Sequence, residues 1–257
     1  MGVVYHGSKN HGIKRLEPRK STHGEYLYAT HDKVLALIFS RKSGDDLTFD
    51  VGHFGIDKDA PWQLVENIPG AFDKMFSNSS SIYTFSDETF KDINTGFDEV
   101  VSSVGADVIS EEYVDNVFEG IKKAQEAGLV TIYRYPNKPE GLKQDGSDIL
   151  DKWKYYKENL NKDFEKREFD RLAYLHPELL DKINILSKDL GYDYYYTPGD
   201  LISLFKKACD IQLRDSEHEL YVDSSYISIV NNFPEIREII DETYEYYKER
   251  LEVSKAK

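Results

Sequence analysis

The sequence predicts an α+β protein in which a strand-rich first part is followed by a mainly helical second part. Up to about residue 102, short apolar or alternating segments are separated by clusters of Gly, Pro, Asn and Asp, a pattern typical of strands and turns. From about residue 110 onward, apolar residues recur at helical spacing. The hydrophobic share of 40% is typical of a globular chain. We therefore expect a boundary near residue 110, which separates residues 1–110 from residues 111–257.

The first predicted strand, residues 3–5, ends in the polar triplet His6-Gly7-Ser8. The imidazole of His6 can donate or accept a hydrogen bond. Gly7 has no Cβ, so a flat ligand can approach its peptide groups. Such a strand end suits a ligand-binding edge, although the same triplet is also an ordinary transition from a strand to a turn.

A second strand and a helix are predicted between residues 25 and 39. Residues 25–30 alternate and contain two tyrosines, which indicates a strand. Thr30 or Asp32 can cap the helix that follows. Its apolar face consists of Val34, Leu35, Ile38 and Phe39. Further short strands are expected at residues 47–51, 62–65, 82–85 and 98–102, and the last of these contains Glu99.

Helices dominate the prediction for the second part of the chain. Residues 114–124 form an amphipathic pattern that Gly128 ends, and residues 129–133 form a short strand. One long helix is expected from about residue 147 to about residue 175. Further helices are expected to begin at Pro177, Pro198, Ser216 and Pro234, where first-turn prolines or a capping box mark the start.

Charge and cysteine content limit the classes of function. The formal net charge is −14, from 33 basic and 47 acidic residues, so the overall field repels nucleic acid and anionic membrane. Residues 14–20 are locally basic in this acidic chain, and they either bind a phosphate or are exposed to solvent. One cysteine, Cys209, excludes an internal disulfide, and the histidines are not spaced as metal ligands. We expect a cytoplasmic protein without a metal and without a membrane partner.

Three polar residues on separate predicted strands suggest a chemistry: His6, Tyr28 and Glu99. Cleavage of an N-glycosidic bond to nicotinamide passes through an oxocarbenium-like transition state, which a carboxylate stabilises. The nicotinamide ring needs an aromatic face, its carboxamide needs a peptide donor and acceptor, and ribose hydroxyls need a polar partner. Glu99, Tyr28, Gly7 and His6 can supply these contacts in that order.

This combination resembles the His-Tyr-Glu signature of the diphtheria-toxin and poly(ADP-ribose) polymerase class of ADP-ribosyltransferases, over roughly residues 1–105. The resemblance implies a split antiparallel β core. It also implies that His6 binds the adenosine ribose of NAD and that the backbone of Gly7 hydrogen-bonds the nicotinamide carboxamide. Ser8, the next residue, belongs to the same NAD-binding segment. Tyr28 would stack on nicotinamide, Phe39 would close the other side, and Glu99 would polarise the nicotinamide ribose.

Each assignment has an alternative in the sequence. His6 and Tyr28 can be structural residues, and Tyr26 lies on the same strand face as Tyr28. Glu219, in Glu217-His218-Glu219, resembles the Glu-x-Glu of the arginine-specific transferases, but it also fits the capping box with Ser216. The strand context favours Glu99 over Glu219 as the catalytic acid.

The resemblance implies a mono-ADP-ribosyltransferase that uses NAD as its substrate and needs no metal. The acceptor is left open between protein, nucleic acid and small molecule. The alternative is a non-catalytic module that binds NAD, ADP-ribose or a protein partner in a phage or bacterial setting. A third possibility is an RNA 2′-phosphotransferase, which shares the superfamily fold but wants a basic cluster around the pocket.

Overall fold

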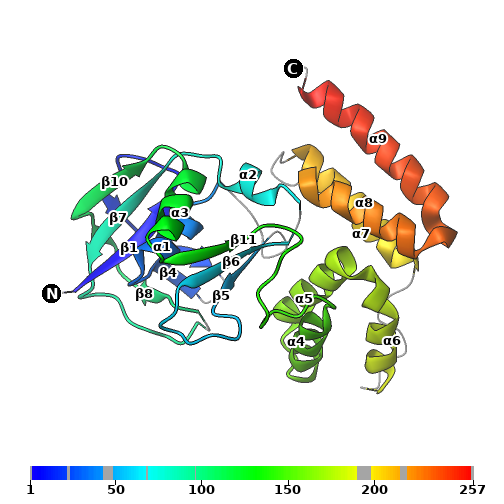
Figure 1. The fold of residues 1–257 in the computed structure, drawn as a ribbon, viewed down its shortest axis with the longest axis horizontal. Coiled ribbons are helices and arrows are strands. Elements are labelled where there is room, and N and C mark those ends of the chain that lie inside the picture. The colour runs from blue at the N-terminus through cyan, green and yellow to red at the C-terminus, as the bar shows by residue number, and fades with distance from the viewer. Residues whose placement is uncertain are drawn as a thin grey trace. The chain divides into compact units, whose positions relative to one another are not determined.

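The structure, a computed structural model, describes residues 2–21, 24–42, 49–67, 69–95, 97–189, 198–214 and 219–255. It is an α+β protein with antiparallel sheets and a helical C-terminal region (Figure 1). The chain forms two compact units that alternate along the sequence. The first unit comprises Met1–Gly44, Asp59–Trp62 and Phe72–Ile132, and the second comprises Asp45–Lys58, Gln63–Ala71 and Tyr133–Lys257. The expected boundary near residue 110, between residues 1–110 and residues 111–257, stays a prediction.

The first unit contains most of the strands. They are β1 (Val3–Ser8), β2 (Arg15–Leu16), β3 (Arg19–Ser21), β4 (Gly24–Ala29), β7 (Ser80–Ser86), β8 (Val100–Ser102), β9 (Ala106–Asp107) and β10 (Ser110–Val114). Strand β7 lies between β1 and β10, and β4 lies between β3 and β8. A bridge between Tyr5 and Thr30 joins β1 to β4. All of these pairings are antiparallel, as the sequence predicted.

A hydrophobic core forms on one face of these strands because apolar residues occupy alternate positions. Val4 on β1 lies opposite Phe85 on β7, and both are fully buried. Leu27 and Ala29 on β4 join the same cluster. The strands at residues 3–5, 25–30 and 82–85 were predicted from this alternation, and the structure confirms them.

Helix α1 (Lys33–Phe39) follows β4, and Asp32, one of the two candidate caps in the sequence, caps it. The Asp32 carboxylate accepts hydrogen bonds from the backbone of Val34 (2.7 Å) and Leu35 (3.1 Å). Its other oxygen accepts one from the indole nitrogen of Trp62 (2.7 Å). Five consecutive residues, 34–38, are buried, so α1 is covered on more than one side. It packs against β1 and against α3 (Val117–Glu126).

Strands β5 (Phe49–Gly52), β6 (Trp62–Glu66) and β11 (Val130–Tyr133) form a further sheet of order β11-β6-β5, and α2 (Ala71–Met75) follows β6. The second unit contains the remaining helices. They are α4 (Ser147–Glu158), α5 (Lys162–Leu175), α6 (Leu180–Asp189), α7 (Pro198–Arg214), α8 (Glu219–Asn232) and α9 (Arg237–Lys255), with 3-10 turns at Pro177–Leu179 and Pro234–Ile236. Helix pairs α4–α5, α7–α9 and α8–α9 pack together around apolar side chains such as Trp153, Phe205 and Tyr247.

The single long helix expected from residue 147 to residue 175 is wrong. Two helices, α4 and α5, occupy this stretch. Leu160 adopts a left-handed backbone conformation (φ 55°), which ends α4, and the side chain of Asn161 then caps α5. No Gly or Pro marks this turn, so the apolar spacing alone could not reveal it. The proposed cap at Ser216 lies outside the described residues.

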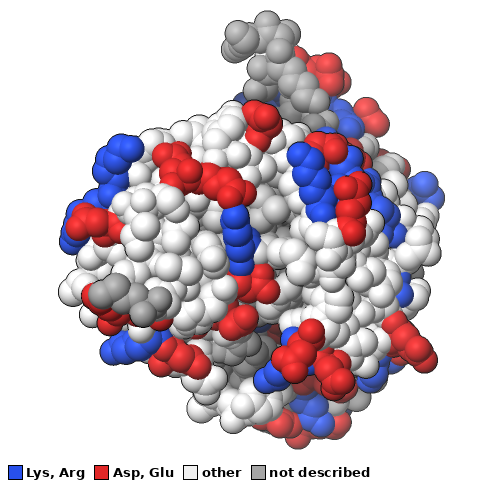
Figure 2. All heavy atoms as spheres, turned by 60° about the vertical axis from the view of Figure 1, so that its left-hand side comes forward, with Lys and Arg blue, Asp and Glu red and all other residues white. Residues whose placement is uncertain are grey.

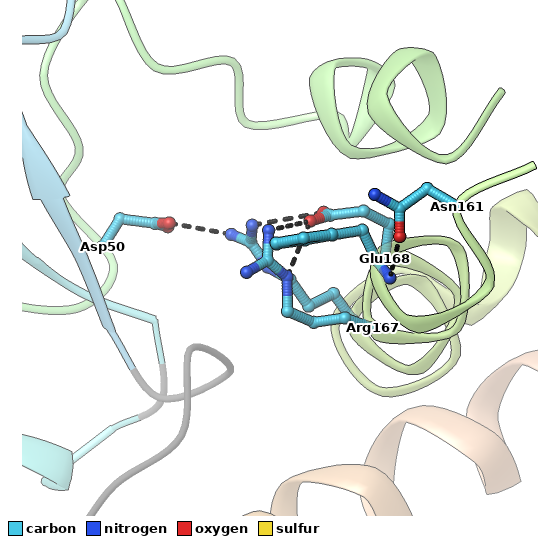
Figure 3. Close-up of polar contacts among 6 residues, drawn as sticks. Asp50, Asn161, Arg167 and Glu168 are labelled. Carbon is cyan, nitrogen blue, oxygen red and sulfur yellow. Dashed lines mark hydrogen bonds and ion pairs between the residues drawn. The ribbon is translucent and has the colours of Figure 1, made fainter. Parts of the chain in front are cut away.

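A buried charge network joins β5 to α5 within the second unit (Figure 3). The Arg171 guanidinium, whose side chain is only 6% exposed, donates to Asp50 (2.8 Å) and to Glu168 (3.3 Å). Arg167 donates to the other oxygen of Glu168 (3.0 Å), and Asn67 donates to the other oxygen of Asp50 (2.8 Å). The buried carboxylate of Glu168 and the partly buried carboxylate of Asp50 are thereby satisfied on each oxygen, which is the condition for tolerating charge in a core.

Candidate functional site

His6 and Tyr28, two of the three polar residues that suggested the chemistry, are in contact. His6 Nδ1 is 2.8 Å from the carbonyl oxygen of Tyr28. A carbonyl oxygen only accepts, so Nδ1 carries the proton and donates it. In the neutral ring, Nε2 is then an acceptor. The strand end therefore presents a hydrogen-bond acceptor of fixed orientation.

The pKa of His6 is lowered from its ordinary value. Burial of the ring is the main cause, and the nearby positive charge of Arg19 acts in the same direction. The hydrogen bond to the Tyr28 carbonyl opposes both effects. At neutral pH the imidazole is uncharged, and Nε2 keeps its lone pair.

Gly7 is required by packing, and its peptide groups point away from β7. A Cβ at Gly7 would lie 2.0 Å from the backbone oxygen of Ala36, so only glycine allows α1 to approach β1 this closely. Tyr5 exchanges two backbone hydrogen bonds with Thr30, at 2.7 and 2.9 Å. Because peptide groups two residues apart point to the same side of a strand, those of Gly7 point away from β7. The described residues provide no hydrogen bond to Gly7 on that side.

The ring of Tyr28 lies on the same strand face as that of Tyr26, as expected from a spacing of two residues. Their centroids are 6.3 Å apart in an edge-to-face arrangement. The hydroxyl of Tyr28 is buried and has no hydrogen-bond partner among the described residues. A buried, unsatisfied hydroxyl is unfavourable, and a bound ligand could satisfy it. Tyr26 has no such buried, unsatisfied hydroxyl in the described structure, so this property distinguishes the two tyrosines.

Glu99 lies directly before β8 and not within a strand, so the predicted strand at residues 98–102 starts too early. Its backbone nitrogen donates to the carbonyl oxygen of Phe97 (2.9 Å), and this turn delays the start of β8. Strand β8 pairs with β4 so that Val100 lies opposite Ala29 and Val101 opposite Tyr28. Glu99 therefore lies at the Thr30 end of the pair, about 10 Å from β1 if two strand spacings separate them.

Phe39 and Ser8 have other contacts in this structure. The Phe39 ring is 37% exposed, meets the ring of Phe97 edge-on at 5.5 Å, and lies under the guanidinium of Arg41. Among the described residues it has no ring contact with Tyr28. The hydroxyl of Ser8 accepts from the backbone nitrogen of Asn10 (3.1 Å) and shapes the turn after β1. Sequence reasoning placed both residues against a ligand, and the structure by itself gives them local roles.

A carboxylate on β10 was missed by the sequence analysis. One oxygen of Glu111 accepts hydrogen bonds from the backbone of Gly12 (2.8 Å) and from the hydroxyls of Ser81 (2.7 Å) and Tyr83 (3.0 Å). These bonds, the first above all, hold the pKa of Glu111 below its ordinary value. In the register of the sheet, Tyr83 lies between His6 and Glu111.

Glu112, the next residue, points to the opposite face of β10. In the same register, Ile82 separates it from Gly7, and its carboxylate pairs with Lys33 at the start of α1 (2.5 Å). The segment around these two residues is an exposed edge strand with little apolar alternation, so its sequence gave no strand signal. Glu219 begins α8, and its side chain lies outside the described residues.

Other charged groups are explained by their contacts. The network of Asp50, Glu168 and Arg171 uses both oxygens of each carboxylate within the protein (Figure 3) and offers no ligand site. Arg15, from the basic stretch, pairs with Glu17 (2.6 Å) and Asp107 (3.0 Å). On the face drawn in Figure 2, basic and acidic side chains are interspersed.

Three further features bear on function: the single cysteine, possible metal ligands and possible membrane-spanning helices. Cys209 is buried, and burial raises the pKa of its thiol to about 12, which agrees with a packing role. Among the residues described, no group of three or more His, Cys, Asp or Glu side chains could hold a metal ion. No helix in the described ranges is long and apolar enough to cross a membrane.

No protein-family model, no curated protein and no solved structure matches this chain. Its function is therefore inferred from its own residues and geometry. His6, Gly7 and Tyr28 meet at one strand end, and Glu99 lies at the start of the strand that pairs with the strand of Tyr28.

Proposed function

We propose that the chain is a NAD-dependent mono-ADP-ribosyltransferase. It would break the N-glycosidic bond between nicotinamide and ribose and transfer ADP-ribose to an acceptor that is a protein, a nucleic acid or a small molecule. The observation that supports this most is the contact between His6 and the Tyr28 carbonyl, beside the peptide groups of Gly7 that point away from β7. One cysteine and no disulfide suit a reducing compartment, so a cytoplasmic location belongs to the same proposal.

The ligand contacts follow from the groups that lack partners. The Gly7 peptide N–H and C=O can bind the nicotinamide carboxamide, which needs one donor and one acceptor. The Tyr28 ring can stack on the nicotinamide, and its buried hydroxyl would gain a partner. His6 Nε2 can accept a hydrogen bond from a ribose hydroxyl. Phe39, which is partly exposed at the end of α1, would close the ring site, and Ser8 would support the turn beside it.

The chemical step needs little from the protein beyond orientation and charge. When the C1′–N bond breaks, nicotinamide leaves with the bonding electrons and the ribose gains positive charge. A carboxylate beside the ribose stabilises this charge, and the acceptor then adds at C1′ and loses its proton. We assign this carboxylate to Glu99, because it directly precedes β8, the strand that pairs with the strand of Tyr28.

The test is the release of free nicotinamide from NAD by the purified chain, with and without cell lysate as a source of acceptors. Glu99→Gln should lower the rate about 100-fold or more, as expected for loss of a group that stabilises transition-state charge. Glu112→Gln is the matched control, because it makes the same change on an exposed carboxylate of β10.

The outcomes separate the alternatives. If Glu112→Gln or Glu111→Gln abolishes release while Glu99→Gln does not, the role of Glu99 is wrong and the acid lies on β10. If the wild type releases no nicotinamide under any condition, the enzyme proposal fails. Saturable binding of NAD without release would then identify a binding module.

A further inference from the structure

Arg19 is an exposed cation that lies near the candidate site. It is the first residue of β3 and pairs in register with Tyr26 of β4, two residues before Tyr28. Strand β3 pairs with β4 at Tyr26 and β1 pairs with β4 at Thr30, so Arg19 and His6 approach Tyr28 from opposite directions along β4. The positive charge of Arg19 is the smallest of the three causes that set the pKa of His6, and it lowers that pKa. Within the described ranges, Arg19 has no ion pair and no hydrogen bond, whereas Arg15 on β2 is paired with two carboxylates.

Within the described residues, the exposed guanidinium of Arg19 is available to bind an anion. The chain carries 47 acidic residues, yet the described structure brings none of them to this guanidinium. The charge instead lies beside a histidine whose protonated form it repels. An arginine in such a position suits a phosphate, because its planar group of donors can bind two phosphate oxygens at once.

The tautomer of His6 narrows the ligand further. Nδ1 donates to the Tyr28 carbonyl, so Nε2 accepts, and an acceptor binds a hydroxyl and not a phosphate oxygen. The positive charge of Arg19 helps to keep the ring neutral and thus keeps this acceptor available. One ligand that offers a hydroxyl to His6 and an anion to Arg19 is a ribose that carries a phosphate.

We propose that Arg19 binds the phosphate of a ribose-phosphate ligand whose ribose hydroxyl donates to His6 Nε2. The inference rests on the proposed function, and it names the pyrophosphate of NAD or ADP-ribose as the group that Arg19 recognises. Arg19 is a binding residue and takes no part in breaking the glycosidic bond.

The experiment compares the binding of ADP-ribose and of adenosine by calorimetry. Adenosine has the ribose hydroxyls but no phosphate. The variants are Arg19→Gln and, as the matched control, Lys20→Gln. Lys20 is the neighbouring cation on β3, is equally exposed, and points to the opposite face because side chains alternate along a strand. Thermal unfolding of each variant checks that the exposed substitutions leave the fold intact.

The expected result is that Arg19→Gln weakens ADP-ribose binding about tenfold or more, as for loss of a hydrogen bond between charged groups. Arg19→Gln should bind adenosine as tightly as the wild type does. Lys20→Gln should bind both ligands as tightly as the wild type does. Added salt should weaken the binding of ADP-ribose to the wild type more than to Arg19→Gln. Equal affinities in wild type and Arg19→Gln, or equal losses in both variants, would overturn the inference.

The two proposals fail in different ways. If nicotinamide is released and Arg19→Gln leaves the KM for NAD unchanged, the role of Arg19 is wrong and the enzyme proposal stands. If ADP-ribose binds through Arg19 but no nicotinamide is released, the enzyme proposal fails and the phosphate site stands. If the wild type binds neither ADP-ribose nor NAD, both fail.

Discussion

The imidazole of His6 donates from Nδ1 to the carbonyl oxygen of Tyr28 across 2.8 Å, and so one side chain bridges the strands β1 and β4 just past their last backbone pair. Beyond Tyr5 and Thr30, β1 and β4 exchange no backbone hydrogen bonds in the described residues. The His6 side chain therefore supplies a donor to the Tyr28 carbonyl oxygen, which has no backbone donor on this side. The histidine therefore stabilises the fold in its neutral form, whether or not it also binds a ligand.

A pH dependence of stability follows from this contact. The folded-state pKa of His6 is lowered below the value near 6.5 expected when the chain is unfolded, so the unfolded state takes up the proton first as the pH falls. The stabilisation is present above pH 6.5 and is lost as the pH falls through the folded-state pKa. Urea unfolding should give a lower free energy at pH 5.5 than at pH 7.5, and His6→Gln should reduce this difference. An equal difference in His6→Gln and in the exposed control His31→Gln would contradict the assignment.

Arg19 should control the titration of His6. Removal of the positive charge in Arg19→Gln takes away one of the causes that lower the pKa, so the pKa of His6 should rise. The chemical shift of the imidazole Hε1 proton, followed by NMR across the pH range, measures this directly. Lys20→Gln should leave the titration where it was. A pKa of His6 unchanged by Arg19→Gln would show that the two groups are not close in solution.

Gly7→Ala should destabilise the fold strongly. The added Cβ would overlap the backbone oxygen of Ala36, and neither backbone can move without disturbing α1. We expect a loss of about 3 kcal/mol, at the upper end of over-packing costs. Gly12→Ala is the control, because a Cβ there meets nothing within 4 Å and suffers only from the left-handed φ of 71°, a cost of about 1 kcal/mol. Denaturant unfolding compares the two, and a smaller loss in Gly7→Ala would refute the packing argument.

Tyr28→Phe should leave the protein as stable as the wild type or slightly more stable. The substitution removes a buried hydroxyl that has no partner among the described residues, and such a group is unfavourable by about 1–3 kcal/mol. The aromatic face is kept, so nicotinamide stacking should survive. Thermal unfolding measures the first effect and NAD titration the second. Marked destabilisation would mean that the hydroxyl has a protein partner after all.

Arg171→Met should be among the most damaging substitutions in the second unit. It leaves the buried carboxylate of Glu168 and the partly buried carboxylate of Asp50 without their shared cation, and a loss of about 3–5 kcal/mol is typical when a buried ion pair is broken. Arg237→Met is the control, since its ion pair with Asp241 lies on the surface and contributes about 0.5 kcal/mol. Urea unfolding curves of both variants give the comparison. A similar small loss in the two would show that water reaches the network.

The sequence predicted those parts of the fold that local patterns determine. The alternation in β1, β4 and β7 and the cap at Asp32 are short-range features, and they were found correctly. The break at Leu160 was missed because a left-handed residue that is not glycine has no signature in the sequence. The edge strand β10 was missed because charged residues occupy both of its faces.

The candidate site was predictable in its residues but not in its contacts. His6 and Tyr28 were identified from residue type and strand position. Their hydrogen bond could not be predicted, because it depends on the pairing of Tyr5 with Thr30, which brings β1 beside β4. The partners of Glu111 come from three separate segments, so no local pattern could indicate them. The proximity of Arg19 to His6 likewise depends on how β3, β4 and β1 pair.

The hydrogen bond between Arg171 and Asp50 spans 121 residues of chain, and this has a consequence for synthesis on the ribosome. At about 5–20 residues per second, the carboxylate of Asp50 leaves the ribosome roughly 6–24 s before the guanidinium that neutralises it. Of the two described partners of Asp50, only Asn67 has been synthesised during that interval. The hairpin of β5 and β6 therefore stays exposed to water until α5 is made. A nascent chain stalled before α5 should therefore expose this hairpin to proteases, and one stalled well beyond it should not.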